Sequence, residues 1–502
     1  MNLRPLLNWQ RKAGKDRRLS FIRSMARHHH RARVYLVGGV VRDLLLHRAI
    51  KDLDFVITGM PKATLASFLK QYGVVNFVGK NFGVFKVTPR GWPSGEAIDV
   101  ALPRLDLPAG RSGAYRDVAV ISRATVPIED DLKRRDFTVN AMAWNLADRR
   151  LIDPYNGSHD LAARRLKAVG DPATRFKEDF SRMLRGLRFA VELNFKIEAK
   201  TWRVLRQLIG HLNDTRSGVP VVPREVVARE LLKAFYADPV EALALYERSG
   251  ALTALVPELD ATKRCPQPKP YHTEGTVWRH IKLALQALDS PRFRRRHPTR
   301  PKAELIMAVL LHDIGKPVCL KTPRQHGVDR IRFDGHDVAG GRLAREIAER
   351  LKLASPPADS YLHVDPEHLE WLIGHHLLLL HDAARHMKLT TIEKYFVRNP
   401  LGEHLKALIL ADSLASIPAT GRPVLNHIVT LERTLARMSK HHRKLPASFL
   451  NGNEIMTTLG ITAGPRVGLL LRLLREQQLL GTVQTKVQAI LFMKREYERT
   501  GN

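Results

Sequence analysis

The sequence predicts an α+β protein in which a mixed head precedes a long helical part. Residues 33 to about 160 alternate short apolar runs, which are typical of buried strands, with segments of helical spacing. From about residue 160 the apolar residues recur at helical spacing almost to the end of the chain. A chain of 502 residues is long enough for several hydrophobic cores, so we expect several domains.

The bulk composition favours a polyanionic partner. The chain has 82 Lys and Arg against 50 Asp and Glu, a formal net charge of +32, and 44% hydrophobic residues. This charge favours nucleic acid, with an anionic membrane surface as the alternative. No apolar run is long enough to span a bilayer and the basic residues are spread along the chain, so we expect no membrane contact. Cys265 and Cys319 alone exclude a disulfide scaffold and a cysteine-rich zinc site, which indicates a reducing cytoplasm.

The first 32 residues are rich in arginine, and Asp16 is their only acid. They lack the apolar core of a secretory signal; an acid-poor transit peptide is the alternative. We expect a basic arm that touches RNA.

The stretch around which the chain is organised runs from residue 34 to residue 57. Val34–Val37 predicts a short buried strand, Gly38 and Gly39 follow at once, and a helical pattern begins at Val40. A strand, two glycines and a helix start let backbone N–H groups approach a phosphate closely. A tight turn without a ligand is the alternative interpretation.

A second predicted strand, Leu53–Ile57, carries Asp52 and Asp54 at its start. Residues two apart on a strand point to the same side, about 6–7 Å apart. Two carboxylates on one face can hold Mg²⁺, which proteins bind through one or two carboxylates plus substrate phosphates. Arg42, one turn into the preceding helix, adds a fixed positive charge. A solvated strand end is the alternative interpretation of the two aspartates.

The order Gly-Gly, Arg-Asp and Asp-x-Asp in residues 38–54 resembles the active-site motif of the DNA polymerase β-like nucleotidyltransferases. More narrowly, it is similar to that of the class II tRNA nucleotidyltransferase and bacterial poly(A) polymerase family. The resemblance implies a polymerase β-like head of mixed sheet and helices, with a third carboxylate near the metal pair. We expect Asp99, in the predicted strand Ala97–Ala101, to supply it; a water-facing aspartate is the alternative.

Two further segments of the head bear on its activity. Residues 79–87 predict a hairpin or strand edge, and they are less basic than the corresponding string of bacterial poly(A) polymerases. Residues 103–117 mix Gly, Pro and Arg without periodicity and predict a mobile loop. We expect this loop to decide how many nucleotides are added.

Residues 129–145 begin with Asp130 and Asp131, which predict caps for a short basic helix. The string RRDFTVNAMA within this segment resembles the second motif of the family. The resemblance implies that Arg135 contacts the incoming nucleotide and that Asp136 helps to hold the ribose side of the site.

Residues 178–190 predict one helix in which Arg182, Arg185 and Arg188 recur every three residues. Such arginines fit either a polar site for an anion or a set of surface ion pairs. The segment resembles the family's Glu-Asp-x-x-Arg element followed by Arg-x-x-Arg. The resemblance implies that Asp179 and Arg182 read the base edges of CTP and ATP, and that Arg185 and Arg188 hold the nucleotide and its phosphates.

A second site is predicted beyond a Pro-rich linker at 261–272. The metal set of the HD phosphohydrolase superfamily is matched by residues on separate predicted helices: His280, His312, Asp313 and Asp412. Imidazole and carboxylate ligands suit a transition metal such as Ni²⁺, Mn²⁺, Fe²⁺ or Zn²⁺. His336 and His376 are candidates for a second metal. The resemblance implies phosphodiesterase or phosphatase activity.

The predicted domains are a basic arm (1–32), a catalytic head (33–165), a helical neck and body (166–260), an HD domain (273–420) and a helical tail (421–502). In the tail, Gly464 and Pro465 open a helix with proline at its preferred first position. This turn can offer N–H groups to an RNA phosphate or serve only in helix packing. Residues 450–468 resemble the C-terminal region of bacterial CCA-adding enzymes, which implies a tRNA-binding tail.

The resemblance implies an enzyme that adds C, C and A to the 3′ end of tRNA from CTP and ATP, with Mg²⁺ as cofactor and release of pyrophosphate. Basic surface is expected to grip the tRNA acceptor arm through its shape and phosphates. Poly(A) polymerase and an enzyme of CC or A addition alone are the alternatives within the family. A phosphohydrolase with an RNA-binding head is the alternative from another class.

Overall fold

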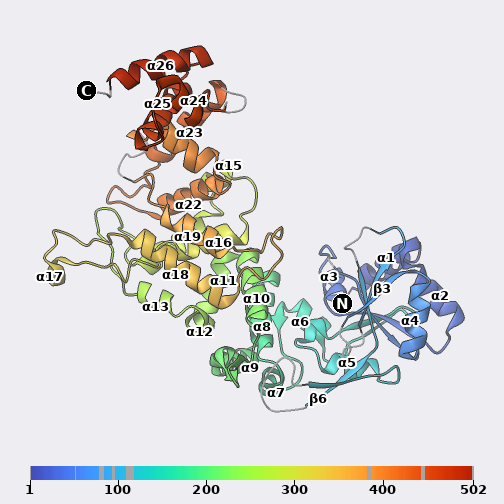
Figure 1. The fold of residues 1–502 in the computed structure, drawn as a ribbon. Coiled ribbons are helices and arrows are strands. Elements are labelled where there is room, and N and C mark those ends of the chain that lie inside the picture. Colours follow the sequence, from blue (N-terminus) through green and yellow to red (C-terminus); the bar gives the residue numbers. More distant parts are fainter. Residues whose placement is uncertain are drawn as a thin grey trace. The chain divides into compact units, whose positions relative to one another are not determined.

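A computed structural model of the chain describes residues 2–50, 52–78, 84–92, 97–108, 118–380, 386–441 and 447–499. The chain forms two compact units, residues 1–257 and 258–502. The first unit contains the sheets and a group of helices, whereas the described residues of the second unit form helices and no named strand (Figure 1).

The head of the first unit is built on a seven-stranded sheet with the order β3-β4-β5-β2-β1-β8-β9 (Figure 1). Its strands are β1 Arg33–Val37, β2 Asp54–Thr58, β3 Gly73–Val78, β4 Val84–Pro89, β5 Ile98–Ala101, β8 Ala143–Asn145 and β9 Arg150–Ile152. Neighbouring strands run antiparallel except β2 and β5, which are parallel. This sheet with its helices confirms the expected mixed head.

The burial of strand β1 explains why its sequence is apolar. Its residues Val34–Val37 are all buried, so both faces of the strand are covered. A strand covered on both faces is a continuous apolar run and does not alternate with polar residues. The helices of the head are α3 Gly39–Leu45, α4 Lys62–Lys70, α5 Ile128–Lys133 and α6 Gly157–Ala162.

The segment expected as a basic arm is folded. It forms α1 Arg4–Ala13 and α2 Ser20–His28, which we call the N-terminal layer together with the residues up to 32. Leu6 and Phe21 are fully buried, and the Phe21 ring meets the Phe55 ring of β2 edge to face with centroids 5.7 Å apart. The apolar side chains of this segment therefore fix it to the sheet while its arginines and lysines face outward.

The helical part of the first unit breaks where one helix was predicted over 178–190. Its helices are α7 Pro172–Glu178, α8 Ser181–Leu193, α9 Ala199–Leu208, α10 Arg224–Ala237, α11 Pro239–Ser249 and α12 Ala251–Leu255. The backbone of Asp179 is extended, with φ −161° and ψ 103°. Its side chain accepts a hydrogen bond from the Ser181 N–H at 2.9 Å, so this aspartate starts a new helix instead of continuing the old one.

The second unit is helical throughout its named elements. They are α13 Glu258–Thr262, α14 Val277–Ala287, α15 Pro291–Arg296, α16 Ala303–Leu311, α17 Pro323–His326, α18 His336–Leu351, α19 Pro366–Gly374, α21 Leu389–Ile392, α22 Gly402–Ala415, α23 Asn426–His441, α24 Gly452–Leu459, α25 Pro465–Leu480 and α26 Lys486–Arg499. Pro465 begins α25, as predicted. The expected linker at 261–272 lies inside this unit, where the buried Gln267 accepts a hydrogen bond from Lys316 at 2.8 Å.

Part of the predicted loop at 103–117 is a strand. β6 Arg104–Pro108 pairs antiparallel with β7 Val118–Ser122, while residues 109–117 lie outside the described residues. Residues 79–83 of the predicted hairpin also lie outside them, and its remainder belongs to β4, paired with β3. Among the described residues, no helix has the length and apolarity needed to cross a membrane.

Candidate functional site

The predicted carboxylates come together at the start of β2. Asp54 and Asp99 are partners in the parallel register of β2 and β5, and Asp52 lies two residues before Asp54, the first residue of β2. Burial raises the pKa of Asp54 to about 6; the Arg135 guanidinium opposes this rise, and the charges of Asp99 and Asp52 add to it. Lys86, on β4, pairs with the Asp99 carboxylate at 3.0 Å. The raised pKa of Asp54, with two further carboxylates beside it, favours a divalent cation as the counter-charge.

Gly38 leaves the room that the site needs. Its φ of +74° is left-handed, and a Cβ built there would lie 2.5 Å from Arg135 Nη1 and 3.9 Å from Asp54 Oδ2. Any larger residue would therefore collide with the Arg135 guanidinium. Arg135 Nη2 donates to Asp131 at 3.2 Å, and its Nη1 donates to the Asn140 carbonyl at 3.3 Å. Gly38 thus brings the fixed cation beside the carboxylates.

Arg42 is held more tightly than the sequence suggested. It is buried, its Nη1 donates to Asn140 Oδ1 at 2.7 Å, and its Nε donates to the neighbouring Asp43 at 2.9 Å. Its guanidinium also lies 5.1 Å from the centre of the Phe189 ring. The Asp43 carboxylate already balances much of its charge, so Arg42 ties α3 to residues 140 and 189.

The prediction that Asp130 and Asp131 cap a helix is wrong, because both residues lie inside helix α5. Helix α5 follows Pro127, and Asp131 is a fully buried residue in its interior. Its carboxylate pairs with Arg134 at 2.7 Å and with Arg135 at 3.2 Å. Burial would raise the pKa of Asp131, but the two guanidinium groups outweigh it and hold that pKa low. Asp131 therefore pairs with two arginine side chains and does not cap the helix.

Asp136 is the centre of a second buried pair. Its Oδ2 lies 2.6 Å from Arg185 Nη2, and its Oδ1 accepts from Asn140 Nδ2 at 3.1 Å. Burial would raise the pKa of Asp136, yet the Arg185 guanidinium and these hydrogen bonds hold it well below the usual range. Asp136 is therefore a fixed anion that orients Arg185 from the helix α8.

The Glu178–Arg182 segment is organised by one carboxylate. Glu178 Oε2 pairs with Arg182 at 2.6 Å and with Arg175 at 2.8 Å. Arg182 Nη2 also donates to the Arg134 carbonyl at 3.1 Å, although the two residues lie on different helical segments. Arg182 is thus held from both sides next to Asp179.

Arg188 forms a brace between helices. It is buried and pairs with Glu192 at 2.6 Å and with Glu230 of α10 at 2.5 Å. Its guanidinium lies 3.9 Å from the centre of the Phe189 ring. The sequence predicted only a capping role for Asp131 and did not single out Glu230; an acid inside an apolar helical pattern was the available signal for Glu230.

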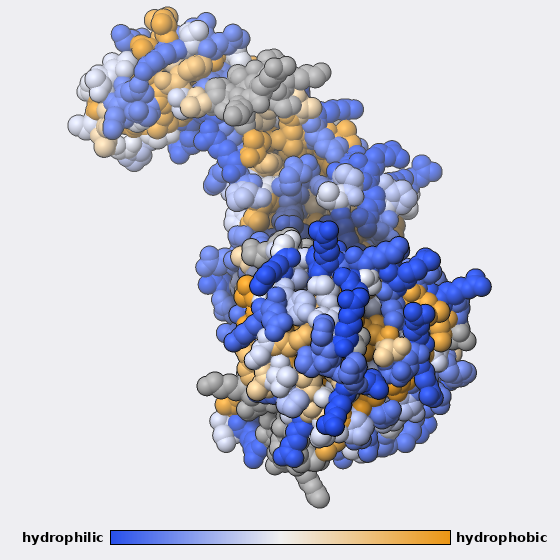
Figure 2. Space-filling model, turned by 90° about the vertical axis from the view of Figure 1, so that its right-hand side faces the viewer, coloured by the Kyte–Doolittle hydropathy of each residue, from blue (hydrophilic) through white to orange (hydrophobic). Residues whose placement is uncertain are grey.

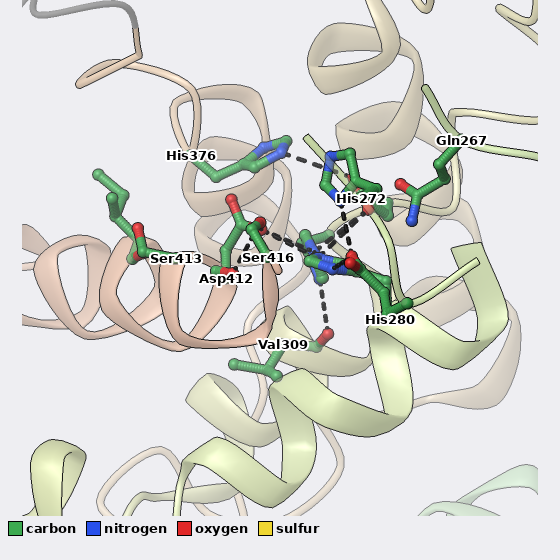
Figure 3. Close-up of polar contacts among 12 residues, drawn as sticks. Gln267, His272, His280, Val309, His376, Asp412, Ser413 and Ser416 are labelled. Atoms are coloured by element: carbon green, nitrogen blue, oxygen red, sulfur yellow. Dashed lines mark hydrogen bonds and ion pairs between the residues drawn. The ribbon is translucent and has the colours of Figure 1, made fainter. Parts of the chain in front are cut away.

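In the second unit, most of the predicted histidines are fixed by the same kind of hydrogen bond from Nδ1. Three of them donate from Nδ1 to a backbone carbonyl three residues earlier: His312 to Val309 at 2.8 Å, His336 to Phe333 at 2.8 Å and His376 to Ile373 at 2.6 Å. His280 Nδ1 instead meets the buried carboxylate of Glu274 at 3.0 Å (Figure 3). Because a carbonyl only accepts, Nδ1 carries the proton and Nε2 is left with a lone pair, the form that binds a metal.

These Nε2 atoms form two groups that share Asp313. One contains His280 and His312, and the other contains His336 and His376. Asp412 lies 2.9 Å from His280 Nε2 and completes the predicted set. The buried Nε2 atoms of His336 and His376 have no hydrogen-bond partner among the described residues. The donor set therefore fits metal ligation, and the shared carboxylate fits two ions.

The titration of this cluster agrees with such a site. Burial, helped by the neighbouring His312, lowers the pKa of His376 to about 4, so its imidazole is neutral at pH 7. Burial would also lower the pKa of His280, but Asp412 and Glu274 raise it to about 9. An ion that binds at His280 must therefore displace a proton, and binding strengthens as the pH rises.

A cavity of about 690 Å³ opens on this cluster. Asp313, His336, His376 and Asp412 line it, together with Lys316, Arg330 and Arg332. Lys316 is buried and pairs with Asp313 at 2.7 Å, a contact that the sequence did not predict. Cations around a metal-type cluster favour an anionic ligand.

Comparison with known proteins identifies the family. Residues 34–167 match the model of the Poly A polymerase head domain, and residues 277–417 match that of the HD domain. The A-adding tRNA nucleotidyltransferase of Deinococcus radiodurans is 34% identical over 74% of this chain and 80% of its own. The chain belongs to the tRNA nucleotidyltransferase and poly(A) polymerase family. It is an enzyme of the nucleotidyltransferase class with an HD domain.

A second relative and two solved structures are also similar to this chain. The multifunctional CCA protein of Alkalilimnicola ehrlichii is 37% identical over 64% of this chain and 70% of its own. Among solved structures, the Bacillus stearothermophilus CCA-adding enzyme in complex with CTP aligns with a TM-score of 0.61 and 21% identity, over 98% of this chain and 99% of its own. The Thermotoga maritima CCA-adding enzyme complexed with tRNA aligns with a TM-score of 0.55 and 20% identity, over 98% of this chain and 95% of its own. These likenesses support the fold over nearly the whole chain.

The raised pKa of Asp54 predicts a pH dependence. Below about pH 6 this carboxyl is protonated and competes with a divalent cation, so at subsaturating Mg²⁺ the rate of nucleotide incorporation should fall as the pH drops through about 6. More Mg²⁺ should shift the midpoint to lower pH, by up to one unit per tenfold increase. Initial rates between pH 5 and 8 at two Mg²⁺ concentrations measure it. A midpoint independent of Mg²⁺ would contradict the assignment.

Proposed function

We propose that the protein adds C, C and A to the 3′ end of tRNA from CTP and ATP, without a nucleic-acid template. The observation that carries the proposal is the pairing of Asp54 with Asp99 across β2 and β5, with Arg135 admitted by Gly38. Membership of a family whose relatives are named for CCA or A addition supports tRNA as the substrate.

The residues at β2 and β5 have distinct roles in this proposal. Asp52, Asp54 and Asp99 would hold Mg²⁺, which when bound supplies charge stabilisation for the attack of the tRNA hydroxyl on the α-phosphorus and for the release of pyrophosphate. The backbone of Gly38 and Gly39 at the start of α3 suits contact with phosphate oxygens. Arg135 adds a positioned cation for the charge that develops on the phosphate.

Base selection is assigned to the turn between α7 and α8. Asp179 accepts hydrogen bonds and Arg182 donates them, as the edges of cytosine and adenine require. The contacts of Arg182 with Glu178 and with the Arg134 carbonyl hold it in one direction before a nucleotide binds. Arg185 pairs with Asp136 but keeps 36% of its side chain exposed, so it is assigned to the nucleotide. Arg42 and Arg188 are buried within their ion pairs and are assigned as braces.

The second unit is assigned a hydrolytic role. His280, His312, Asp313 and Asp412, with His336 and His376, would hold one or two transition-metal ions such as Ni²⁺, Mn²⁺, Fe²⁺ or Zn²⁺, which activate water for phosphoester hydrolysis. The cationic cavity that opens on them suits a phosphate ester.

Addition of A alone is the second candidate. The relative from Deinococcus radiodurans, which aligns over 80% of its own length, is named an A-adding enzyme. This relative is 34% identical over 74% of the present chain, so membership of the family is compatible with addition of A alone.

The product length on tRNA decides between these candidates. With Mg²⁺, CTP and ATP, tRNA that ends at the discriminator base should grow by three nucleotides and stop. Growth only from tRNA ending in CC means A addition, growth by two means CC addition, and long A-tails mean poly(A) polymerase. Asp54→Asn should lower incorporation by at least a thousandfold, because it removes the central carboxylate. No growth with the wild-type protein in any lane would leave the head as an RNA-binding surface.

The template assignment predicts a change in nucleotide choice. On tRNA ending in CC, Arg182→Ala should reduce the preference for ATP over CTP by tenfold or more, since one bidentate contact is worth about 1–3 kcal/mol of discrimination. The ratio of kcat/KM for the two nucleotides measures it. Arg203→Ala, an exposed arginine of α9, is the control. An equal loss for both nucleotides would show that Arg182 only supports the fold.

The histidine cluster predicts a metal that can be removed separately. His376→Ala should abolish hydrolysis of bis-p-nitrophenyl phosphate and lower the metal content of the purified protein, while nucleotide addition persists. His375→Ala is the matched control, because its Nδ1 donates to the Trp371 carbonyl and it belongs to neither ligand group. Metal content by mass spectrometry and both activities are measured. Unchanged metal content in His376→Ala would remove this residue from the ligand set.

A further inference from the structure

A hollow of the head lies on the N-terminal layer, and Asp52, Asp54 and Asp99 do not line it. It has a volume of about 970 Å³ and is lined by α1 and the turn after it, by the first half of α2, by residues 29–30 after α2, by the start of β1 and by the turn between β8 and β9. None of the residues assigned above to nucleotide or metal lines it. We propose that this basic hollow is a second RNA site, which binds the sugar–phosphate backbone of the tRNA.

The charge of the lining is one-sided. Cationic side chains of α1, the turn after it, α2, β1 and the β8–β9 turn line the same space, and no Asp or Glu is among the lining residues; the cations are Arg11, Lys15, Arg23, Arg33 and Arg149, joined by His29 and His30. Arg11, Lys15 and Arg149 form no ion pair within the described part of the chain, and all three are exposed. Cations gathered without acids repel one another, and a bound polyanion relieves that repulsion.

The remaining arginines keep their charge available. Arg33 donates to the His30 carbonyl at 2.8 Å, and Arg23 donates to the Gly14 carbonyl. A backbone carbonyl fixes the direction of a guanidinium without neutralising it. These two arginines are therefore held in place with their net charge intact.

The scaffold of the hollow is fixed by the sheet. Gln10 donates to the Leu146 carbonyl at 2.6 Å, and the Trp144 indole donates to Gln10 Oε1 at 2.8 Å. Leu6 is fully buried beneath α1. Arg149 stands at a left-handed position, φ 53°, in the turn that follows β8. Arg11 and Arg149 are thus presented by separate rigid elements that the Gln10 contacts hold together.

The lining chemistry favours RNA over a small anion. Leu7, Trp9 and Ile22 line the hollow beside the cations, and Leu7 is 41% exposed. Apolar and aromatic side chains next to cations suit sugars and bases as well as phosphates. Figure 2 views the head from the side on which Figure 1 draws α1 and α2, and long hydrophilic side chains dominate that face.

The inference goes beyond the family match. The Poly A polymerase head domain model begins at residue 34, so most of the hollow is made by residues that precede it. The choice of RNA among polyanions rests on the proposed tRNA substrate; the existence of an anion site does not. The test therefore measures binding and catalysis separately.

The test compares two triple variants of the full chain that remove the same charge. The hollow variant is Arg11→Gln, Lys15→Gln and Arg149→Gln. The control variant is Lys12→Gln, Arg17→Gln and Arg150→Gln, which changes exposed sequence neighbours that do not line the hollow. Filter binding measures the affinity for tRNA ending in CC between 50 and 300 mM salt, and circular dichroism confirms that both variants fold.

We expect the hollow variant to bind tRNA tenfold or more weakly at low salt, with a salt slope reduced by about 2–3, since each lost phosphate contact removes about 0.9 from the slope of a duplex. The control variant should lose less than threefold. Incorporation at saturating tRNA should persist in both. Equal weakening of the two variants, or unchanged binding by the hollow variant, would overturn the proposal.

Two further arms separate this outcome from the proposed function. If the wild-type protein binds tRNA but adds no nucleotide, the proposed function fails. The comparison of the two variants still shows whether the hollow binds RNA. Binding to vesicles of phosphatidylserine and phosphatidylcholine is measured in parallel. Loss of vesicle binding without loss of tRNA binding in the hollow variant would overturn RNA as the occupant.

Discussion

The parallel pairing of β2 with β5 is the constraint on which the head depends. It sets Asp54 opposite Asp99 in an otherwise antiparallel sheet, with Asp52 two residues before Asp54. Carboxylates brought together in this way repel one another, and the pKa of Asp54, about 6, records burial together with that repulsion. Arg135 offsets only part of it, and the site has room for Arg135 only because residue 38 is glycine. The sheet thus leaves a local excess of negative charge that a divalent cation satisfies.

Buried and partly buried acids direct most of the arginines around this site. The buried Asp131 and Asp136 hold Arg135 and Arg185, and the partly exposed Glu178 holds Arg182. A buried charge without a partner is costly, so the two buried acids restrict their arginines to few directions. Arginines fixed before substrate binds have little reorganisation left to undergo when phosphate charge develops. The same logic explains why three arginines of one helix, which looked equivalent by spacing, have different partners in the structure.

Features that depend on neighbouring residues could be predicted from the sequence. Contacts that depend on a residue far away in the chain could not. Adjacent residues were enough to predict the strand at β1, the aspartates at 52 and 54 and the His-Asp pair at 312 and 313. In the structure, the aspartates lie with Asp99 and the His-Asp pair lies with the other histidines. The brace between Arg188 and Glu230 joins residues 42 positions apart, which spacing within one helix does not show. The break at Asp179 arises from its own bond to Ser181, which competes with the helix. The N-terminal layer was missed because its arginines dominate the composition, whereas Leu6 and Phe21 decide its packing.

The two units present phosphate chemistry with different ligands. The head offers carboxylate oxygens near the start of two adjacent inner strands, which suit a hard ion such as Mg²⁺ that keeps water and substrate oxygens in its shell. The second unit offers imidazole nitrogens whose Nδ1 protons are fixed by carbonyls or by Glu274, and such donors suit a transition metal. The pKa values agree with this difference in ligands. At pH 7 the pKa of about 4 leaves His376 a neutral nitrogen donor, and the pKa of about 6 leaves Asp54 mainly an anionic oxygen donor. The two donor sets thus favour different classes of ion, a hard ion in the head and a transition metal in the second unit.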